Sequence, residues 1–227
     1  MSPGKIPTSG RETPLSYTVL LSQMLEATLM TLRIFFVTLI FSLPLGMIVA
    51  LGRMTKIKAV SVPVSVYILL MRGTPLMLQL LFIFYGFKPI FGVQLDRVPA
   101  AEVAFVLNYA AYFAEIFRGG IAGIPRGQRE AAKVLGMTRS QTFFRILLPQ
   151  VAKSILPPMG NEVITLVKDT SLAQVIGVVE LLKTTSDWVS SAVSMVPFAI
   201  AGVFYLVMNA VVTKCFAATE KHFAYYR

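Results

Sequence analysis

"REAAKVLGMTRSQTFFRILLPQ", residues 129–150, is a basic, amphipathic stretch that lies between long apolar runs of the chain. Charged residues fall on every side of its first half, so this half cannot span a bilayer as a helix. Helix formers precede Gly136, which fits the left-handed residue that ends a helix. Thr138, with Gln141 three residues later, forms a capping-box pattern that begins a second helix, and Pro149 ends or kinks it. The pattern predicts two short helices joined by a sharp turn.

The rest of the chain is apolar enough for a membrane protein. Its 227 residues are 56% hydrophobic and 14% charged, and the mean hydropathy is +0.70. A bilayer core about 30 Å thick needs roughly 20 apolar residues per helix. Five segments come close: Leu29–Leu51, Val60–Met71 joined through a kink at Pro75 to Leu76–Phe87, Pro99–Phe117, Ile155–Val179 and Ala192–Phe216. We therefore expect an all-α integral membrane protein with five transmembrane helices.

The net charge of +10 reflects basic residues that gather in alternate connections. The positive-inside rule explains this distribution more simply than binding to nucleic acid does. The connections expected in the cytoplasm, and the tail, carry these residues: Arg53, Lys56 and Lys58; Arg118, Arg126, Arg129, Lys133, Arg139, Arg145 and Lys153; Lys221 and Arg227. The amino terminus is then outside the cell and the carboxyl terminus is in the cytoplasm.

The amino-terminal leader, residues 1–16, is polar and lacks the short apolar run of a cleaved signal peptide. We expect a second region, residues 17–227, to form the transmembrane domain. Cys215 is the one cysteine, so an intrachain disulfide or a cysteine-rich metal site is excluded. No phosphate-binding loop, catalytic motif or metal-ligand spacing is present. These observations argue against an enzyme and predict no metal site.

Polar residues inside two of the expected spans fall on single helix faces. Asn108, Tyr112 and Glu115 are spaced i, i+4 and i+7, and Glu162, Thr165 and Asp169 are spaced i, i+3 and i+7. Ionisable groups in a membrane are expensive and usually face a partner or a cavity.

Each of these carboxylates has two interpretations. Glu115 either lines a pathway or is an interfacial partner of Arg118, and Glu162 either faces a solute or makes a structural contact. Lys168 and Asp169 form either an internal ion pair or a pair at the end of the helix near the outer leaflet. The elbow, defined here as residues 126–148, could by periodicity alone be a solvated interfacial helix.

The elbow also resembles the EAA signature of the membrane subunits of ABC importers. The resemblance rests on Glu130-Ala131-Ala132, Gly136, Ile146 and Leu148-Pro149. In that family the signature is a cytoplasmic coupling helix that docks in a groove of the ATP-hydrolysing subunit. Four further segments resemble the branch that takes up polar amino acids: "RGTPLMLQLLFIFYG" (72–86), "NYAAYFAEIFRGGI" (108–121), "GIPRGQREAA" (123–132) and "GNEVITLVKDTSLAQVIGVVEL" (160–181).

This resemblance implies the type I importer permease fold, with a coupling loop at about residues 121–150. It implies three kinds of partner: an ATPase subunit that carries ATP and magnesium, a second permease subunit in a homodimer or heterodimer, and an extracytoplasmic amino-acid-binding protein. The chain itself then needs no cofactor and lies in the bacterial inner membrane. Glu130, Ala131, Ala132 and Gly136 are the expected coupling residues, and Glu130 near the first turn of its helix is expected to favour the helix dipole.

The resemblance also places a substrate pathway among the polar residues of the spans. The expected pathway residues are Asn108, Glu115, Asn161, Glu162 and Thr165, with Glu162 meeting a substrate ammonium. Arg72 and Thr74 are expected to be structural. Two other classes remain open: an ABC permease for methionine or another small solute, and a secondary transporter, which normally needs an internal repeat that this sequence lacks. A channel or scaffold would need no coupling elbow.

Overall fold

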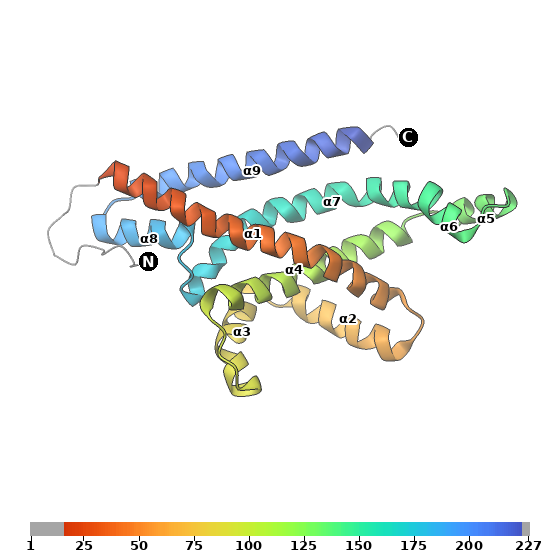
Figure 1. The fold of residues 1–227 in the computed structure, drawn as a ribbon, viewed down its shortest axis with the longest axis horizontal. Helices are drawn as coiled ribbons and strands as arrows, with labels where there is room; N and C mark the ends of the chain where they lie inside the picture. The colour runs from red at the N-terminus through yellow and green to blue at the C-terminus, as the bar shows by residue number, and fades with distance from the viewer. Residues whose placement is uncertain (1–15, 224–227) are drawn as a thin grey trace.

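The computed structural model describes residues 16–223, and these residues are almost entirely helical. Four long helices run along the length of the molecule (Figure 1): α1 (Tyr17–Met54), α4 (Arg97–Ala122), α7 (Leu148–Asp169) and α9 (Val196–Phe223). The expected leader, residues 1–16, lies outside the described part of the chain except for Ser16, which precedes α1.

The core of the molecule forms where α1 and α4 pack along most of their length. Gly46 allows this close approach, because an added Cβ there would lie 2.9 Å from Phe113 Cβ and 3.0 Å from the carbonyl oxygen of Ala110. Small residues of both helices are buried along this contact: Thr38, Ser42, Gly46 and Ala50 of α1, and Ala100, Ala101, Ala104, Ala110, Ala111 and Ala114 of α4. Helices in membranes commonly pack through such small residues, because lipid supplies little hydrophobic drive between them.

The second expected span is two helices rather than one kinked helix. α2 (Lys58–Gly73) and α3 (Leu76–Phe91) meet at an angle of 110°. The break lies where the sequence predicted a kink, since Pro75 lacks an N–H group and disfavours helical backbone at Thr74. The bend is much sharper than a kink within one straight span.

The expected span Ile155–Val179 is wrong at both ends. α7 begins earlier, at Leu148, and ends at Asp169. The chain continues as a 3-10 turn, η2 (Thr170–Ile176), and reverses at Gly177, whose φ of 77° is left-handed. A glycine adopts this backbone without a steric penalty, and it separates α7 from α8 (Leu181–Ala192).

By length and hydropathy, α1, α4 and α9 are the three helices among residues 16–223 that could each cross a membrane, and a fourth crossing results if the bent pair counts as one. The polar residues of α7 remove it from this set. The predicted count of five is therefore not settled by composition and length.

The elbow extends beyond the ends of the long helices. It comprises α5 (Arg126–Val134), α6 (Arg139–Gln141) and a π-helical turn, η1 (Thr142–Leu147), which leads into α7. Figure 1 shows α5 and α6 at the same end of the molecule as the connection between α1 and α2 and the last turn of α9, while α8 lies at the opposite end.

Candidate functional site

The turn at the centre of the elbow has the backbone that the sequence predicts. The amides of Gly136 and Met137 donate to the carbonyl oxygens of Lys133 and Ala132, both at 3.0 Å, which is the Schellman pattern that ends a helix. Gly136 has a φ of 70°, in the left-handed region that favours glycine.

The capping box that follows is also present. The amide of Gln141 donates to Thr138 Oγ1 at 3.2 Å, and the amide of Thr138 donates to Gln141 Oε1 at 2.9 Å. These reciprocal bonds satisfy backbone donors at the start of α6 and fix the direction in which the chain enters η1.

The surface of α5 differs from the sequence prediction in one respect. Glu130 lies in the middle of the nine-residue helix rather than in its first turn, so its interaction with the helix dipole is weak. Ala132 is buried at 2% exposure against the rest of the chain. Val134 and Leu135, by contrast, are 88% and 76% exposed, although both are large and apolar. The elbow therefore presents Glu130 and Ala131 to the outside together with an uncovered apolar edge.

Asn108 holds the break between α2 and α3. Its Nδ2 atom donates to the carbonyl oxygen of Met71 at 3.0 Å and to Gln79 Oε1 at 2.9 Å. Gln79 Nε2 in turn donates to the carbonyl oxygen of Thr74 at 3.1 Å and to Thr74 Oγ1 at 2.8 Å. Backbone groups freed by the break are thus satisfied, as the membrane interior requires. The buried amide of Asn108 thus stabilises this junction. Gln79 lies in an apolar run, so no sequence pattern pointed to its role.

Glu115 is paired with Arg118, which is the interfacial interpretation of this residue. Arg118 Nε lies 3.0 Å from both carboxylate oxygens, and Arg118 Nη2 lies 2.8 Å from Oε2. Two further arginines approach the same carboxylate, Arg72 at 3.9 Å and Arg53 at 4.0 Å. Glu115 therefore lies in a cluster of positive charge between α1, α2 and α4.

Glu162 is half-buried on α7, and no hydrogen bond or ion pair among residues 16–223 engages its carboxylate. Thr165 on the same face is also half-buried, and Asn161 is exposed. Arg72 and Asp169 are close enough to Glu162 to interact with it electrostatically. The three expected pathway residues of α7 therefore lie together at an accessible surface.

Lys168 and Asp169 are the last two residues of α7. Asp169 Oδ2 accepts a hydrogen bond from the hydroxyl of Tyr109 at 2.8 Å, which joins α7 to α4. This position agrees with a helix-end role for the two residues rather than with a closed internal ion pair.

Glu180 is a fully buried carboxylate that sequence reasoning missed. It caps α8 by accepting from the amides of Leu182 at 2.8 Å and Lys183 at 2.7 Å. The hydroxyl of Tyr205 on α9 donates to it at 3.3 Å. Glutamate is not among the residues that favour the N-cap position, and the contact with Tyr205 comes from 25 positions away, so no local pattern marks this role.

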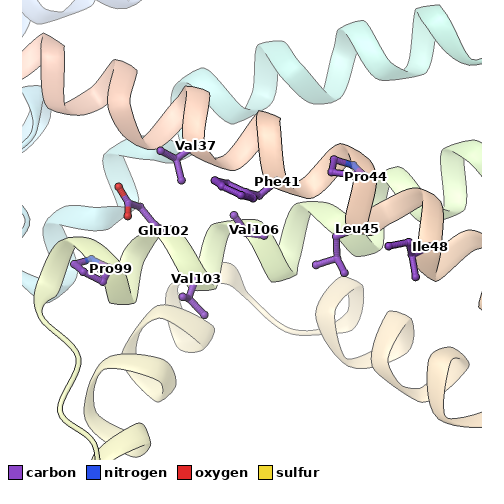
Figure 2. Close-up of a pocket in the computed structure, with 9 residues that line it drawn as sticks. All are labelled: Val37, Phe41, Pro44, Leu45, Ile48, Pro99, Glu102, Val103 and Val106. Atoms are coloured by element: carbon purple, nitrogen blue, oxygen red, sulfur yellow. The ribbon is translucent and has the colours of Figure 1, made fainter.

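An apolar groove of about 520 Å³ runs between α1 and α4 (Figure 2). Glu102 is the charged residue among the nine that line it, and its Oε1 lies 2.8 Å from Arg33 Nε. The other lining residues are Val37, Phe41, Pro44, Leu45, Ile48, Pro99, Val103 and Val106. A lining this apolar suits hydrocarbon and does not match a polar solute.

Two curated transport permeases of Bacillus subtilis (strain 168) are similar to this chain. The L-cystine transport system permease protein TcyB of Bacillus subtilis (strain 168) is 45% identical over 157 residues, which are 69% of this chain and 67% of the relative. The arginine transport system permease protein ArtQ of the same organism is 36% identical over 199 residues, which are 87% of this chain and 91% of the relative.

Solved structures agree with these relatives. A crystal structure of an amino acid ABC transporter with histidines is 33% identical with a TM-score of 0.84, over 92% of this chain and 97% of that chain. The inward-facing MetNI methionine ABC transporter, at 19% identity and a TM-score of 0.70 over 93% of this chain and 99% of that chain, shares the fold alone. The fold is that of a type I ABC importer permease.

Residues 42–223 match the family described as "Binding-protein-dependent transport system inner membrane component". This match covers most of the residues that the structure describes, including the elbow, the charged cluster around Glu115 and the accessible face of α7. The chain therefore belongs to the family of inner membrane components of binding-protein-dependent transport systems, and amino acid ABC transport permeases are among its relatives.

Proposed function

We propose that this chain is the membrane permease subunit of an ABC importer that moves a polar amino acid into the cell. α1, the bent pair of α2 and α3, α4, α7 and α9 form its five membrane crossings. The amino terminus is outside and the carboxyl terminus is cytoplasmic. An external binding protein delivers the solute, and a separate ATPase subunit supplies the energy.

The exposed apolar edge of the elbow carries this proposal. Val134 and Leu135 lie at the carboxyl end of α5, beyond the ends of the long helices, and Glu130 lies on the same short helix. Apolar side chains exposed together usually mark a surface that a partner covers. A groove of the ATPase that receives α5 would bury this edge and place Glu130 and Ala131 at the interface, while Ala132 packs beneath them against the rest of the chain.

The Schellman turn makes α5 and α6 a rigid unit joined to both α4 and α7. A displacement of α5 by the ATPase is therefore passed through η1 into α7, which carries Glu162. Gly136 is the position at which a change of residue would loosen this connection.

The substrate pathway follows the accessible face of α7. Glu162, with Asn161 and Thr165 beside it, offers a carboxylate, an amide and a hydroxyl to the ammonium group of an amino acid. Glu115 lies nearby on α4 as part of the arginine cluster. Asn108 contributes by holding the break of α2 and α3 open at this level.

The test is reconstitution of the whole transporter. The chain is co-purified with its ATPase, its sister permease if it has one, and its binding protein, and uptake into proteoliposomes is measured for arginine, glutamine, cystine, methionine and a sugar. ATP-dependent uptake of a polar amino acid is the expected result. Uptake of methionine or the sugar alone, or uptake without an ATPase, would contradict the proposal.

The elbow is tested in the same preparation. Val134→Ser together with Leu135→Ser removes the apolar edge, and we expect the ATPase to dissociate while the permease still inserts. The matched control is Met195→Ser, which removes an exposed apolar residue at the opposite end of the molecule, before α9. Equal loss of the ATPase in both variants would contradict the assignment.

A further inference from the structure

Three arginine side chains from three segments converge on one glutamate. Arg118 Nη2 lies 2.8 Å from Glu115 Oε2, and Arg72 Nη1 lies 3.9 Å from the same oxygen. Arg53 Nε lies 4.0 Å from Oε1. Three positive charges against one negative charge leave two in excess. The three arginine side chains are 40–44% exposed, so this excess of positive charge is accessible to a further anion.

The hydrogen bonds show which arginine is available to such an anion. Arg118 uses Nε and Nη2 on the carboxylate of Glu115, and Arg53 Nη1 donates to the hydroxyl of Ser65. The guanidinium of Arg72 lies over the ring of Tyr112, 5.2 Å from its centroid. No residue that the structure describes accepts a hydrogen bond from Arg72. Its planar donor fork therefore lies within ion-pair range of Glu115 but has no hydrogen-bond acceptor among residues 16–223.

A cleft of about 400 Å³ lies beside this fork, between α1, α2 and α4. It is lined by Arg53, Ser65, Ile68, Leu69, Arg72, Gly73, Tyr112 and Glu115. The cleft is open to the surface of the molecule, and its lining combines apolar side chains with a few polar groups that a carboxylate can reach. Arg72 is also close enough to Glu162 on α7 to interact with it electrostatically.

We propose that this cleft binds a carboxylate, that Arg72 is its main ligand, and that the bound group is the α-carboxylate of the transported amino acid. The last step rests on the proposed function. A guanidinium fork matches the two oxygens of a carboxylate in a way that an ammonium cannot. With the carboxylate at Arg72, the ammonium would be directed out of the cleft toward the charge of Glu162, which is not among the residues that line it.

The phosphate of an anionic lipid headgroup shares this chemistry. Arg72 favours the solute, because its position near Glu162 gives the site a negative pole beside its positive one, and a phosphatidylglycerol headgroup has no cation to place there. A zwitterion satisfies both poles.

The experiment compares an amino acid with its carboxamide, which keeps the ammonium and the side chain but lacks the carboxylate charge. The purified permease–ATPase complex is placed in nanodiscs without its binding protein, and affinities are measured for arginine, glutamine and cystine, each beside its carboxamide. We expect the wild-type complex to bind the transported amino acid about ten- to a hundredfold more tightly than the carboxamide, as for a charge-assisted hydrogen bond.

Arg72→Gln should lower the affinity for the acid to that for the carboxamide and leave the carboxamide affinity unchanged. Arg72→Lys keeps the charge but loses the planar fork, so it should retain part of the preference for the amino acid over its carboxamide. This variant also provides the comparison if the Gln variant does not assemble. The matched control is Arg33→Gln, which removes an arginine of α1 that pairs with Glu102 outside the cleft. This control should keep the full preference.

The inference is overturned if the wild-type complex shows no preference for the acid, or if Arg72→Gln lowers both affinities equally. Nanodiscs of phosphatidylcholine alone and with phosphatidylglycerol distinguish the two sources of anion. An effect of Arg72→Gln that exists only with phosphatidylglycerol assigns the cleft to lipid phosphate and also overturns it. Failure of the wild-type transporter to carry any amino acid would instead contradict the proposed function.

Discussion

Gly136 shows how one residue can determine the geometry of a docking segment. Its φ of 70° lies in a region that a β-branched residue enters only with strain, and no heavy atom lies within 4 Å of an added Cβ. Gly136→Val therefore strains the backbone without creating a clash. This strain costs roughly 1–3 kcal/mol of conformational free energy. We expect substrate-stimulated ATP hydrolysis to fall while the permease still inserts. Hydrolysis is measured on the reconstituted complex.

Gly136→Asn is the matched control, because asparagine tolerates the left-handed region better than valine does. It should keep most of the hydrolysis. If the valine variant retains wild-type assembly and stimulation, the turn does not transmit coupling.

Glu162→Gln tests the carboxylate of the proposed pathway, since glutamine keeps the size of the side chain and removes the charge. We expect apparent affinity at the membrane site to fall about ten- to a hundredfold, with a larger loss for arginine than for a neutral amino acid. The measurement is uptake at several solute concentrations. Glu26→Gln, an exposed glutamate of α1, is the control. Unchanged uptake of every carried solute would leave Glu162 with a structural role.

Local rules predicted the residues of the elbow, because a left-handed glycine and a capping box need partners only a few positions away. The same rules missed Gln79 and Glu180. Gln79 meets Asn108 from a segment 29 positions away, and Glu180 meets Tyr205. Such contacts depend on how the helices are arranged relative to one another, and the residue pattern within one segment does not predict this arrangement.

At the scale of the elements, the contact of α1 with α4 depends on the absence of a side chain at Gly46. We expect Gly46→Val to separate these helices and to lower the yield and thermal stability of the folded permease, because overpacking a close contact typically costs about 1–3 kcal/mol. Gly202→Val is the matched control, since Gly202 also lies in a long helix and has nothing within 4 Å of an added Cβ. Melting in detergent is the measurement. Equal melting of the two variants would contradict this account.

Apolar runs predicted the positions of the long helices, because a segment that spans a membrane is marked by its own composition. They did not predict the angle of 110° between α2 and α3, nor the end of α7 at Asp169. Pro75 marks the break but does not set its angle, which is held by Gln79 of α3 itself together with Asn108 of α4. Ala173, Ile176 and Val178 are apolar residues that are buried inside the protein. Composition cannot distinguish such burial from contact with lipid.

At the scale of the whole molecule, the long helices place the elbow, the connection of α1 with α2 and the last turn of α9 at one end (Figure 1). These are the segments in which the basic residues gather, so the positive-inside rule and the arrangement of the helices agree on which surfaces share a side. Charge pattern alone predicted this grouping. The side of the membrane on which each end lies is a separate property, and it requires a measurement in cells.

Two single cysteines test this orientation, after the exposed Cys215 is replaced by serine. Gly127→Cys in α5 should react with a thiol reagent only after the membrane is opened, because the proposed function places the elbow in the cytoplasm. Val93→Cys, an exposed position in the connection of α3 with α4, should react in intact cells. Val93 is preferable to the neighbouring Gly92, whose φ of 74° would strain a cysteine. Because one proposed crossing, α4, separates the two positions, the two cysteines must differ. Labelling of both from one side would mean that α4 does not cross the membrane, and the coupling assignment would fail with it.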